Sequence, residues 1–181
     1  GMVTTNDPTF AKRLRILRHH GIDQDLVARD PHRPWHYEMM MLGYNYRLSD
    51  INCALGLSQL TRLETALARR AQIAQRYSQA FSALPGVRLP VVHSSVRHAW
   101  HLYPIRLDPA VFQVDRDECL RALRAEGLQA TVHFLPVYRH PYYQAQLGYG
   151  GQEGAYPVTE AASAQLFSLP IFQAMTEQDI N

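Results

Sequence analysis

The sequence predicts a mixed α/β protein in which a long helix joins two bodies. One observation is a helical pattern that persists from Ser49 to Leu84, which is longer than an ordinary globular helix. Another is the alternation of strand and helix patterns beyond Leu84, which is typical of a small α+β domain. Composition supports both, since 181 residues with 46% hydrophobic content suffice for a sizeable buried core.

The first body begins with a strand and a helix. Met2–Thr5 has the pattern of a short strand, and Asp7-Pro8 is a typical helix start with proline in the first turn. We expect the helix to run from about Pro8 to His19 and to end at Gly21. Its periodicity predicts an outward Lys12 and a buried face of Phe10, Leu14 and Leu17.

A long irregular segment follows from Ile22 to Tyr37. It shows no period, and Asp30-Pro31 and Arg33-Pro34 exclude a regular helix. Loops of this length are uncommon in compact domains and are usually functional or mobile.

Ser49 is the expected N-cap of the long helical pattern, and Pro85-Gly86 ends it. A pattern of this length predicts a break near Gly56–Ser58, followed by a connecting helix. One face of this helix is expected to be apolar, because apolar residues recur three, four or seven positions apart: Leu60, Leu63, Leu67, Ala74, Tyr77, Phe81 and Leu84. We call this face the apolar stripe.

The second body has a ferredoxin-like alternation. The pattern predicts a strand over Trp100–Leu107, a helix over Asp115–Ala125 that ends at Gly127, and a strand over Gln129–Leu135. Further along, we expect an irregular segment from Pro136 to Tyr143, a glycine-rich turn over Gly148–Gly154, and a helix over Val158–Phe167. Thr176–Asp179 has the pattern of a helix cap and first turn, but we expect it to be too short to hold a helix.

Charge and hydropathy exclude several classes of protein. The net charge of +2 is small and the signs are interspersed, which argues against nucleic acid and anionic membranes as partners. No apolar run approaches the roughly 20 residues of a membrane helix, and no secretion signal is visible, so a cytoplasmic location is expected. Cys53 and Cys119 are expected to be reduced thiols, and the histidines lack the spacing of a zinc site.

Two groups of side chains suggest ligand binding. Asn45 and Arg47 alternate on an extended segment, so both point the same way, and an amide with a guanidinium suits a phosphate. The alternative is structural, with Arg47 paired to Asp50 and Asn45 capping a turn. His133 ends a predicted strand before a tyrosine-rich loop, where either a ligand contact or a structural role would fit.

Six motifs lie in order along nearly the whole chain: GMVTTND at 1–7, RHHGI at 18–22, WHYEMMMLGYNYRLSDINCALGLSQL at 35–60, HLY at 101–103, HFLPV at 133–137 with PYY at 141–143, and LP at 169–170. Together they resemble the DegT/DnrJ/EryC1/StrS family of pyridoxal-phosphate sugar aminotransferases, which have fold type I. Within that family the resemblance is greatest to the transaminases of the pseudaminic acid pathway.

The resemblance implies the C-terminal half of such an enzyme. Residues 1–57 would be the tail of the cofactor-binding large domain, 58–85 the connecting helix, and 86–181 a small α+β domain cut short in its last helix. In the family, the Schiff-base lysine precedes the counterpart of Met2–Thr5. Lys12 is the only lysine here and does not occupy that position, so no catalytic residue is expected in this chain.

The resemblance also assigns binding roles. Asn45 would reach the phosphate of pyridoxal 5'-phosphate across a dimer, and Arg47 would contact either that phosphate or the sugar nucleotide. Tyr46 would also face the substrate. From the small domain, the sugar pocket would be lined by His133, Phe134, Tyr138 and Tyr142.

The reaction implied is transfer of an amino group from glutamate to a UDP-linked 4-keto-6-deoxy sugar, with a homodimer or a separate N-terminal half completing the site. A noncatalytic dimerisation or complementation module derived from the same family is the alternative. The chain departs from relatives at Tyr138-Arg139-His140, where His-Leu-Gln is common, at His19, where Ser is common, and at Asn52, where Gln is common.

Overall fold

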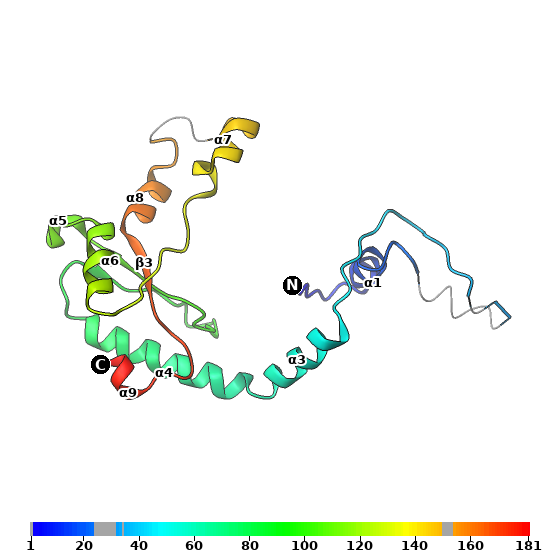
Figure 1. Ribbon diagram of the computed structural model, residues 1–181, viewed down its shortest axis with the longest axis horizontal. Helices are drawn as coiled ribbons and strands as arrows, with labels where there is room; N and C mark the ends of the chain where they lie inside the picture. The colour runs from blue at the N-terminus through cyan, green and yellow to red at the C-terminus, as the bar shows by residue number, and fades with distance from the viewer. Residues whose placement is uncertain (1, 24–31, 34, 150–153) are drawn as a thin grey trace. The chain divides into compact units, whose positions relative to one another are not determined.

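The computed structural model describes residues 2–23, 32–33, 35–149 and 154–181. It divides into two units, Gly1–Thr61 and Arg62–Asn181 (Figure 1). Part of the expected Ile22–Tyr37 loop and most of the glycine-rich turn at Gly148–Gly154 lie outside the described residues.

In the first unit, helix α1 spans Pro8–Leu17, with Asp7 as its N-cap. The Asp7 carboxylate accepts hydrogen bonds from the Thr9 and Phe10 backbone N–H groups at 2.8 and 3.2 Å, which satisfies donors that the first turn leaves open. The predicted face is partly wrong, because Ile16 is the buried residue and Phe10 is exposed. The predicted strand at Met2–Thr5 is also wrong, since within the described part of the unit this segment pairs with no other strand.

Helix α3 spans Asp50–Leu60 and begins at the predicted N-cap, Ser49. The predicted break at Gly56–Ser58 is wrong, because α3 continues through it and ends at Leu60. A single glycine weakens a helix without ending it. The break falls at Thr61, whose hydroxyl donates to the Ser58 carbonyl at 2.8 Å. None of the residues of α3 is buried in this chain.

The second unit is built on helix α4, Leu63–Phe81, and a sheet of three short strands. The strands are β1, Val87–Arg88, β2, Tyr103–Leu107, and β3, Leu166–Leu169, in the order β1-β2-β3. Both pairings are antiparallel, with Val87 opposite Leu107 and Tyr103 opposite Leu169.

Side-chain alternation on β2 sets the position of the core. Tyr103, Ile105 and Leu107 are buried, as the period of two along a strand requires when one face is covered. The buried cluster includes Ile73, Ala74 and Tyr77 of α4, so two residues of the predicted stripe are confirmed. Leu60, Leu63 and Leu84, at the ends of that stripe, are exposed.

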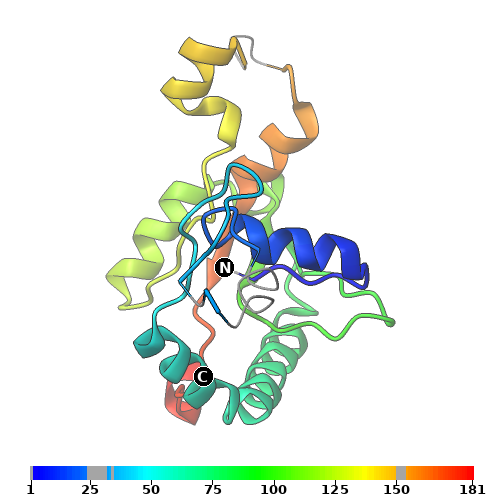
Figure 2. The same ribbon diagram turned by 90° about the vertical axis from the view of Figure 1, so that its right-hand side faces the viewer.

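The remaining helices of the second unit are short. They are α5, Pro109–Phe112; α6, Arg116–Ala125; the 3-10 turn η1, Val137–Arg139; α7, Pro141–Leu147; α8, Pro157–Gln165; and α9, Glu177–Ile180. Figures 1 and 2 show α8 leading directly into β3, with α7 beyond it on the side away from the sheet. The helix predicted at Asp115–Ala125 is confirmed as α6, with Asp115 as its N-cap.

Several predicted boundaries in this unit are wrong. The strand expected at Gln129–Leu135 is reduced to one bridge between Thr131 and Ser168. The helix expected at Val158–Phe167 ends earlier, at Gln165. Its last two expected residues belong instead to β3, because they form backbone pairs with β2. Trp100 lies outside β2 because its φ of 49° is incompatible with a strand. The segment expected to be irregular contains η1 and α7.

The last turn, α9, is stabilised by α4, which corrects the expectation that so short a segment would hold no helix. Thr176 and Asp179 form a capping box, with the Thr176 N–H donating to Asp179 at 2.7 Å. Arg69 donates to the Glu177 carboxylate at 3.0 Å and to the Met175 carbonyl at 2.8 Å, and Arg76 also pairs with Glu177. Two guanidinium groups on one carboxylate compensate for the small number of helical hydrogen bonds.

We predict that attachment of α9 depends on the charge of Glu177. Hydrogen bonds from Arg69 and then Arg76 lower the pKa of Glu177 from its ordinary 4.5. A lowered pKa means that the stabilisation is present above 4.5 and is lost as the pH falls through the folded-state value. Backbone amide shifts of Asp179–Asn181 should therefore move toward those of an unstructured chain in acid. Glu177→Gln should show the same shifts at neutral pH, and unchanged shifts in that variant would contradict the prediction.

Candidate functional site

In the first unit, residues 43–47, which precede α3, pass very close to residues 18–21 at the end of α1. We call this close approach the crossing. The His20 N–H donates to the Tyr44 carbonyl and the Tyr46 N–H donates to the Arg18 carbonyl, both at 2.9 Å. A methyl group on Gly43 would lie 2.0 Å from the backbone nitrogen of Gly21. Glycine is therefore needed at both positions where the two segments cross. Gly21 also has a φ of 73°, which favours glycine.

This crossing presents Asn45 and Arg47 on one side. The Arg47 Nε–H donates to the Asn45 Oδ1 at 3.3 Å, so the two side chains meet, as their alternation predicted. Both residues are exposed. The ion pairs among the described residues do not include the alternative partner, Asp50. The guanidinium therefore keeps most of its donors for a ligand.

Tyr46 is the third predicted residue of this segment. Its ring stacks on that of Tyr44, with centroids 4.9 Å apart and planes 3° apart. Both rings are exposed, so the pair forms a flat aromatic surface beside the amide and the guanidinium. Such a surface suits a planar or apolar ligand group.

The electrostatics of the crossing favour an anion. Burial, together with the charges of Arg47, His20 and Arg18, lowers the pKa of His19 from its ordinary 6.5. The same positive charges would attract a phosphate, whose oxygens suit guanidinium and amide donors. The residues present thus fit the phosphate group of a cofactor such as pyridoxal phosphate.

Lys12 does not take part in this group of side chains. It lies on the outward face of α1, as predicted, and its Nζ is 3.2 Å from the Asp23 carboxylate. An ammonium in an ion pair is a weak nucleophile, because only its neutral form attacks a carbonyl.

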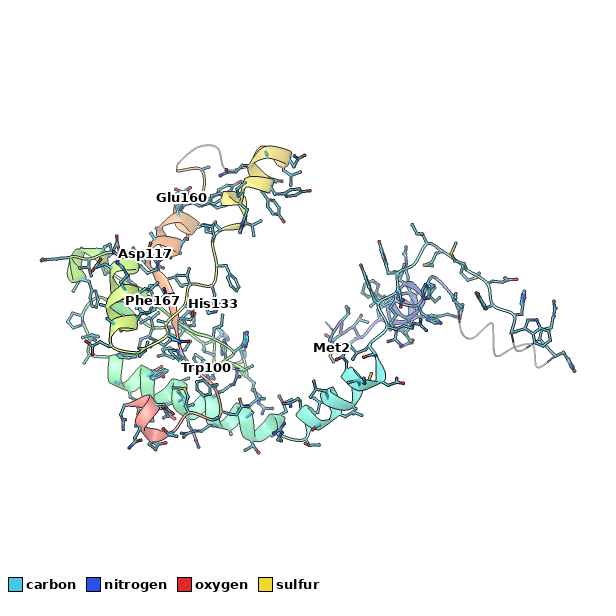
Figure 3. All side chains as sticks on the ribbon, viewed as in Figure 1. Met2, Trp100, Asp117, His133, Glu160 and Phe167 are labelled. Atoms are coloured by element: carbon cyan, nitrogen blue, oxygen red, sulfur yellow. The ribbon has the colours of Figure 1, made fainter. Side chains whose placement is uncertain are left out.

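In the second unit, His133 is fixed by strand β3. Its Nδ1 lies 3.0 Å from the Oγ of Ser168, which is buried in β3. Figure 3 labels His133 and Phe167, the residue of β3 that precedes Ser168. The bridge between Thr131 and Ser168 holds the two segments together. The ring of Phe134 meets that of His133 edge to face, at 5.0 Å, and is largely exposed.

We predict that Ser168→Ala removes the orienting partner of His133. The free energy of unfolding should fall by about 1 kcal/mol, as expected when one buried hydrogen bond is lost. Ser94→Ala, at an exposed loop position, should change it by less than about 0.5 kcal/mol. Urea unfolding of the three proteins measures the effect, and equal stabilities would show that the contact contributes nothing.

The tyrosine-rich segment is only partly assembled. The ring of Tyr138 packs on that of Tyr156 at 4.6 Å, and the Tyr138 hydroxyl is buried without a hydrogen-bond partner among the described residues. Tyr142 is exposed and contacts Tyr143. The structure brings His133 and Phe134 together, but Tyr138 and Tyr142 make their ring contacts elsewhere.

A cavity of about 520 Å³ lies on the second unit beside this segment. None of the predicted binding residues lines it, although Leu135 and Arg139 come from the same stretch of chain. The other lining residues come from α6 and its N-cap, α8 and position 132: Asp115, Arg116, Asp117, Val132, Ser163 and Ala164. No sequence signal marked this surface, because its members are far apart in the chain.

Other kinds of site find no support in the described part of the chain. There, no cluster of His, Cys, Asp and Glu suits a metal ion, and no helix is long and apolar enough to cross a membrane. Cys53 and Cys119 are both free thiols.

The fold matches that of a known class of enzyme. The chain aligns with PseC of Helicobacter pylori, an aminotransferase of pseudaminic acid biosynthesis, over 97% of its own length and 44% of that protein's, at 26% identity and a TM-score of 0.77. It aligns with DesV of S. venezuelae over 98% of its length and 43% of that protein's, at 29% identity and a TM-score of 0.79. The architecture is therefore that of the C-terminal portion of a fold type I sugar aminotransferase.

The family follows from the sequence of the whole chain. Residues 1–181 match the model of the DegT/DnrJ/EryC1/StrS aminotransferase family, and the chain belongs to that family. It is 39% identical to the spore coat polysaccharide biosynthesis protein SpsC of Bacillus subtilis, and 35% identical to the uncharacterized protein MJ1066 of Methanocaldococcus jannaschii.

Each of these two alignments covers nearly all of this chain and 46% of the relative, so the chain spans about half the length of the curated relatives it matches. Enzymes of this family use pyridoxal phosphate, and a Streptococcus pneumoniae structure with the same fold has been solved in its PLP form.

Proposed function

We propose that this chain is the C-terminal portion of a pyridoxal-phosphate-dependent nucleotide-sugar aminotransferase and is inactive alone. The observation that carries the proposal is the family match over residues 1–181. The position of Lys12, ion-paired on the outward face of α1, supports a Schiff-base lysine outside this chain.

In this proposal the first unit supplies a phosphate clamp. The Asn45 amide and the Arg47 guanidinium bind the cofactor phosphate, in trans across a homodimer or toward a separate N-terminal half, and the Tyr44–Tyr46 surface bounds the substrate. When bound, the cofactor supplies the electron sink for amino transfer. The second unit contributes sugar-facing walls from His133, Phe134, Tyr138 and Tyr142.

We propose glutamate as the donor and a UDP-linked 4-keto-6-deoxy sugar as the acceptor. The likeness to PseC supports a sugar of the pseudaminic acid type, and the likeness to SpsC supports a role in polysaccharide biosynthesis. Tyr138 stands where we expect a histidine in relatives, and it would alter the part of the pocket that faces the acceptor sugar. A phenol offers one hydroxyl for hydrogen bonding, whereas an imidazole offers two nitrogens. We also propose a cytoplasmic location for the protein.

A noncatalytic dimerisation or complementation module is the second candidate. The observation that favours it is α3, which buries no residue in this chain and exposes Ile51, Leu55 and Leu57. An apolar helix surface of this kind requires a cover, which a second copy or an N-terminal half would provide.

The test is a chimera in which the preceding part of SpsC is joined to this chain. Glutamate should convert the cofactor of the chimera from its aldehyde form to its amine form, which changes the absorbance spectrum without any sugar acceptor. Asn45→Ala together with Arg47→Gln should weaken cofactor binding by at least about tenfold. Thr61→Ala, between α3 and α4, serves as the matched surface variant.

The two candidates predict different results. A folded chimera that binds the cofactor and reacts with glutamate supports the enzyme. The chimera could instead fold and dimerise but bind no cofactor, while SpsC measured in parallel does bind it. That result would contradict the proposed enzyme function and support the interaction module.

A further inference from the structure

His19 lies directly opposite Asn45 at the crossing in the first unit. The two residues form an antiparallel bridge, flanked by the hydrogen bonds from the His20 N–H to the Tyr44 carbonyl and from the Tyr46 N–H to the Arg18 carbonyl. A pair flanked in this way is the non-hydrogen-bonded kind, in which the opposed side chains project to the same side and lie closest together. The His19 imidazole and the Asn45 amide therefore share one face.

The fold leaves the Nδ1 of the His19 imidazole without a hydrogen bond to any described residue. This Nδ1 is buried, whereas Nε2 is not among the buried atoms that lack a partner. A buried N–H without an acceptor is costly, so the neutral ring carries its proton on Nε2.

The charges around the ring keep it neutral and attract an anion. Arg47 comes from the crossing segment, and His20 and Arg18 come from the end of α1. Together with burial, they hold the pKa of His19 below its ordinary 6.5. In its neutral form the ring is a hydrogen-bond donor on the face where the Asn45 amide and the Arg47 guanidinium meet.

We propose that His19 is a third ligand group of this anion site and donates from Nε2–H to a phosphate held by Asn45 and Arg47. The inference rests on the proposed function, because it takes the phosphate at this segment to be the cofactor's. It follows that the negative charge of the phosphate offsets the arginines, so that binding makes the ring easier to protonate.

The experiment is a histidine titration by NMR on the full chain, with pyridoxamine 5'-phosphate as the probe. This compound carries the phosphate and the ring but has no aldehyde to react with Lys12 or the N-terminus. Pyridoxamine, which lacks the phosphate, is the matched control ligand. His19→Gln assigns the ring signals, and His93→Gln, in the other unit, is the control variant.

We expect the titration midpoint of His19 to rise by about one pH unit with pyridoxamine 5'-phosphate and to stay unchanged with pyridoxamine. His19→Gln should weaken binding of the probe about two- to tenfold, while His93→Gln should leave it unchanged.

Two other outcomes would overturn the inference in different ways. If the probe shifts the amide signals of Asn45 and Arg47 but not the titration of His19, the inference fails and the proposed function stands. If no signal of the crossing responds to the probe, the inference fails, and cofactor binding by the chimera decides the proposed function separately. The titration is made on the unaltered chain, so a folding defect in a variant does not decide the result.

Discussion

Gly43→Ala should dismantle the crossing that presents Asn45 and Arg47. The added methyl group would lie 2.0 Å from the Gly21 nitrogen and 2.6 Å from the His20 carbonyl carbon, and both are backbone atoms that cannot rotate away. Relief requires the two segments to separate, which breaks the hydrogen bonds of the His20 and Tyr46 amides. The expected cost is about 3 kcal/mol, at the upper end of overpacking penalties.

Amide hydrogen exchange measures this effect at the crossing itself. The His20 and Tyr46 amides should exchange much faster in Gly43→Ala, and binding of pyridoxamine 5'-phosphate should be lost. Gly56→Ala is the matched control, since a methyl group there meets no atom within 4 Å. It should stabilise α3 by about 0.5–1 kcal/mol. Unchanged exchange at His20 in Gly43→Ala would contradict the close approach.

Phe167→Ala should cause the largest loss of stability in the second unit. Phe167 is 1% exposed, and it lies on β3 opposite Ile105 of β2, inside the cluster that joins the sheet to α4. Truncation removes apolar burial and leaves a cavity, which together cost about 3–5 kcal/mol.

Denaturant unfolding measures this cost, with Trp100 as the reporter. The sequence has two tryptophans, so a Trp35→Phe background leaves Trp100, which packs against the same cluster, as the only indole. Phe172→Ala is the control, because that ring is 46% exposed, and it should change the stability by less than about 0.5 kcal/mol. Equal midpoints for the two variants would mean that Phe167 is not part of the core.

Local chemistry predicted four helix starts correctly, although the turn after Thr176 was expected to be too short to hold a helix. Asp7, Ser49, Asp115 and Thr176 each cap a helix in the structure, because a side-chain oxygen that accepts from the first-turn amides acts within a few residues. The same locality explains the correct alternation of Asn45 and Arg47.

Features that depend on distant partners were predicted poorly. Leu166 and Phe167 continue the helical pattern predicted from Val158, yet they belong to β3 because they pair with β2. The turn α9 is held by Arg69 and Arg76, more than a hundred residues earlier in the chain. Sequence periodicity carries no information about either partner.

The candidate site shows the same division. From the residues alone, an anion at Asn45 and Arg47 and a structural pairing were both open, and the anion site stays a prediction, based on the fit of amide and guanidinium groups to a phosphate. The proposal for His19 depends on its bridge to Asn45, which only the fold reveals.

The central claim is that this chain supplies the phosphate clamp while the reactive lysine lies elsewhere in the enzyme. Reductive trapping with pyridoxal phosphate and borohydride, followed by peptide mapping, tests it most directly. The isolated chain should show no saturable, stoichiometric adduct at Lys12, and the chimera should carry its label on a lysine of the SpsC part. A saturable adduct at Lys12 in the isolated chain would contradict the claim and show that this chain forms an active site of its own.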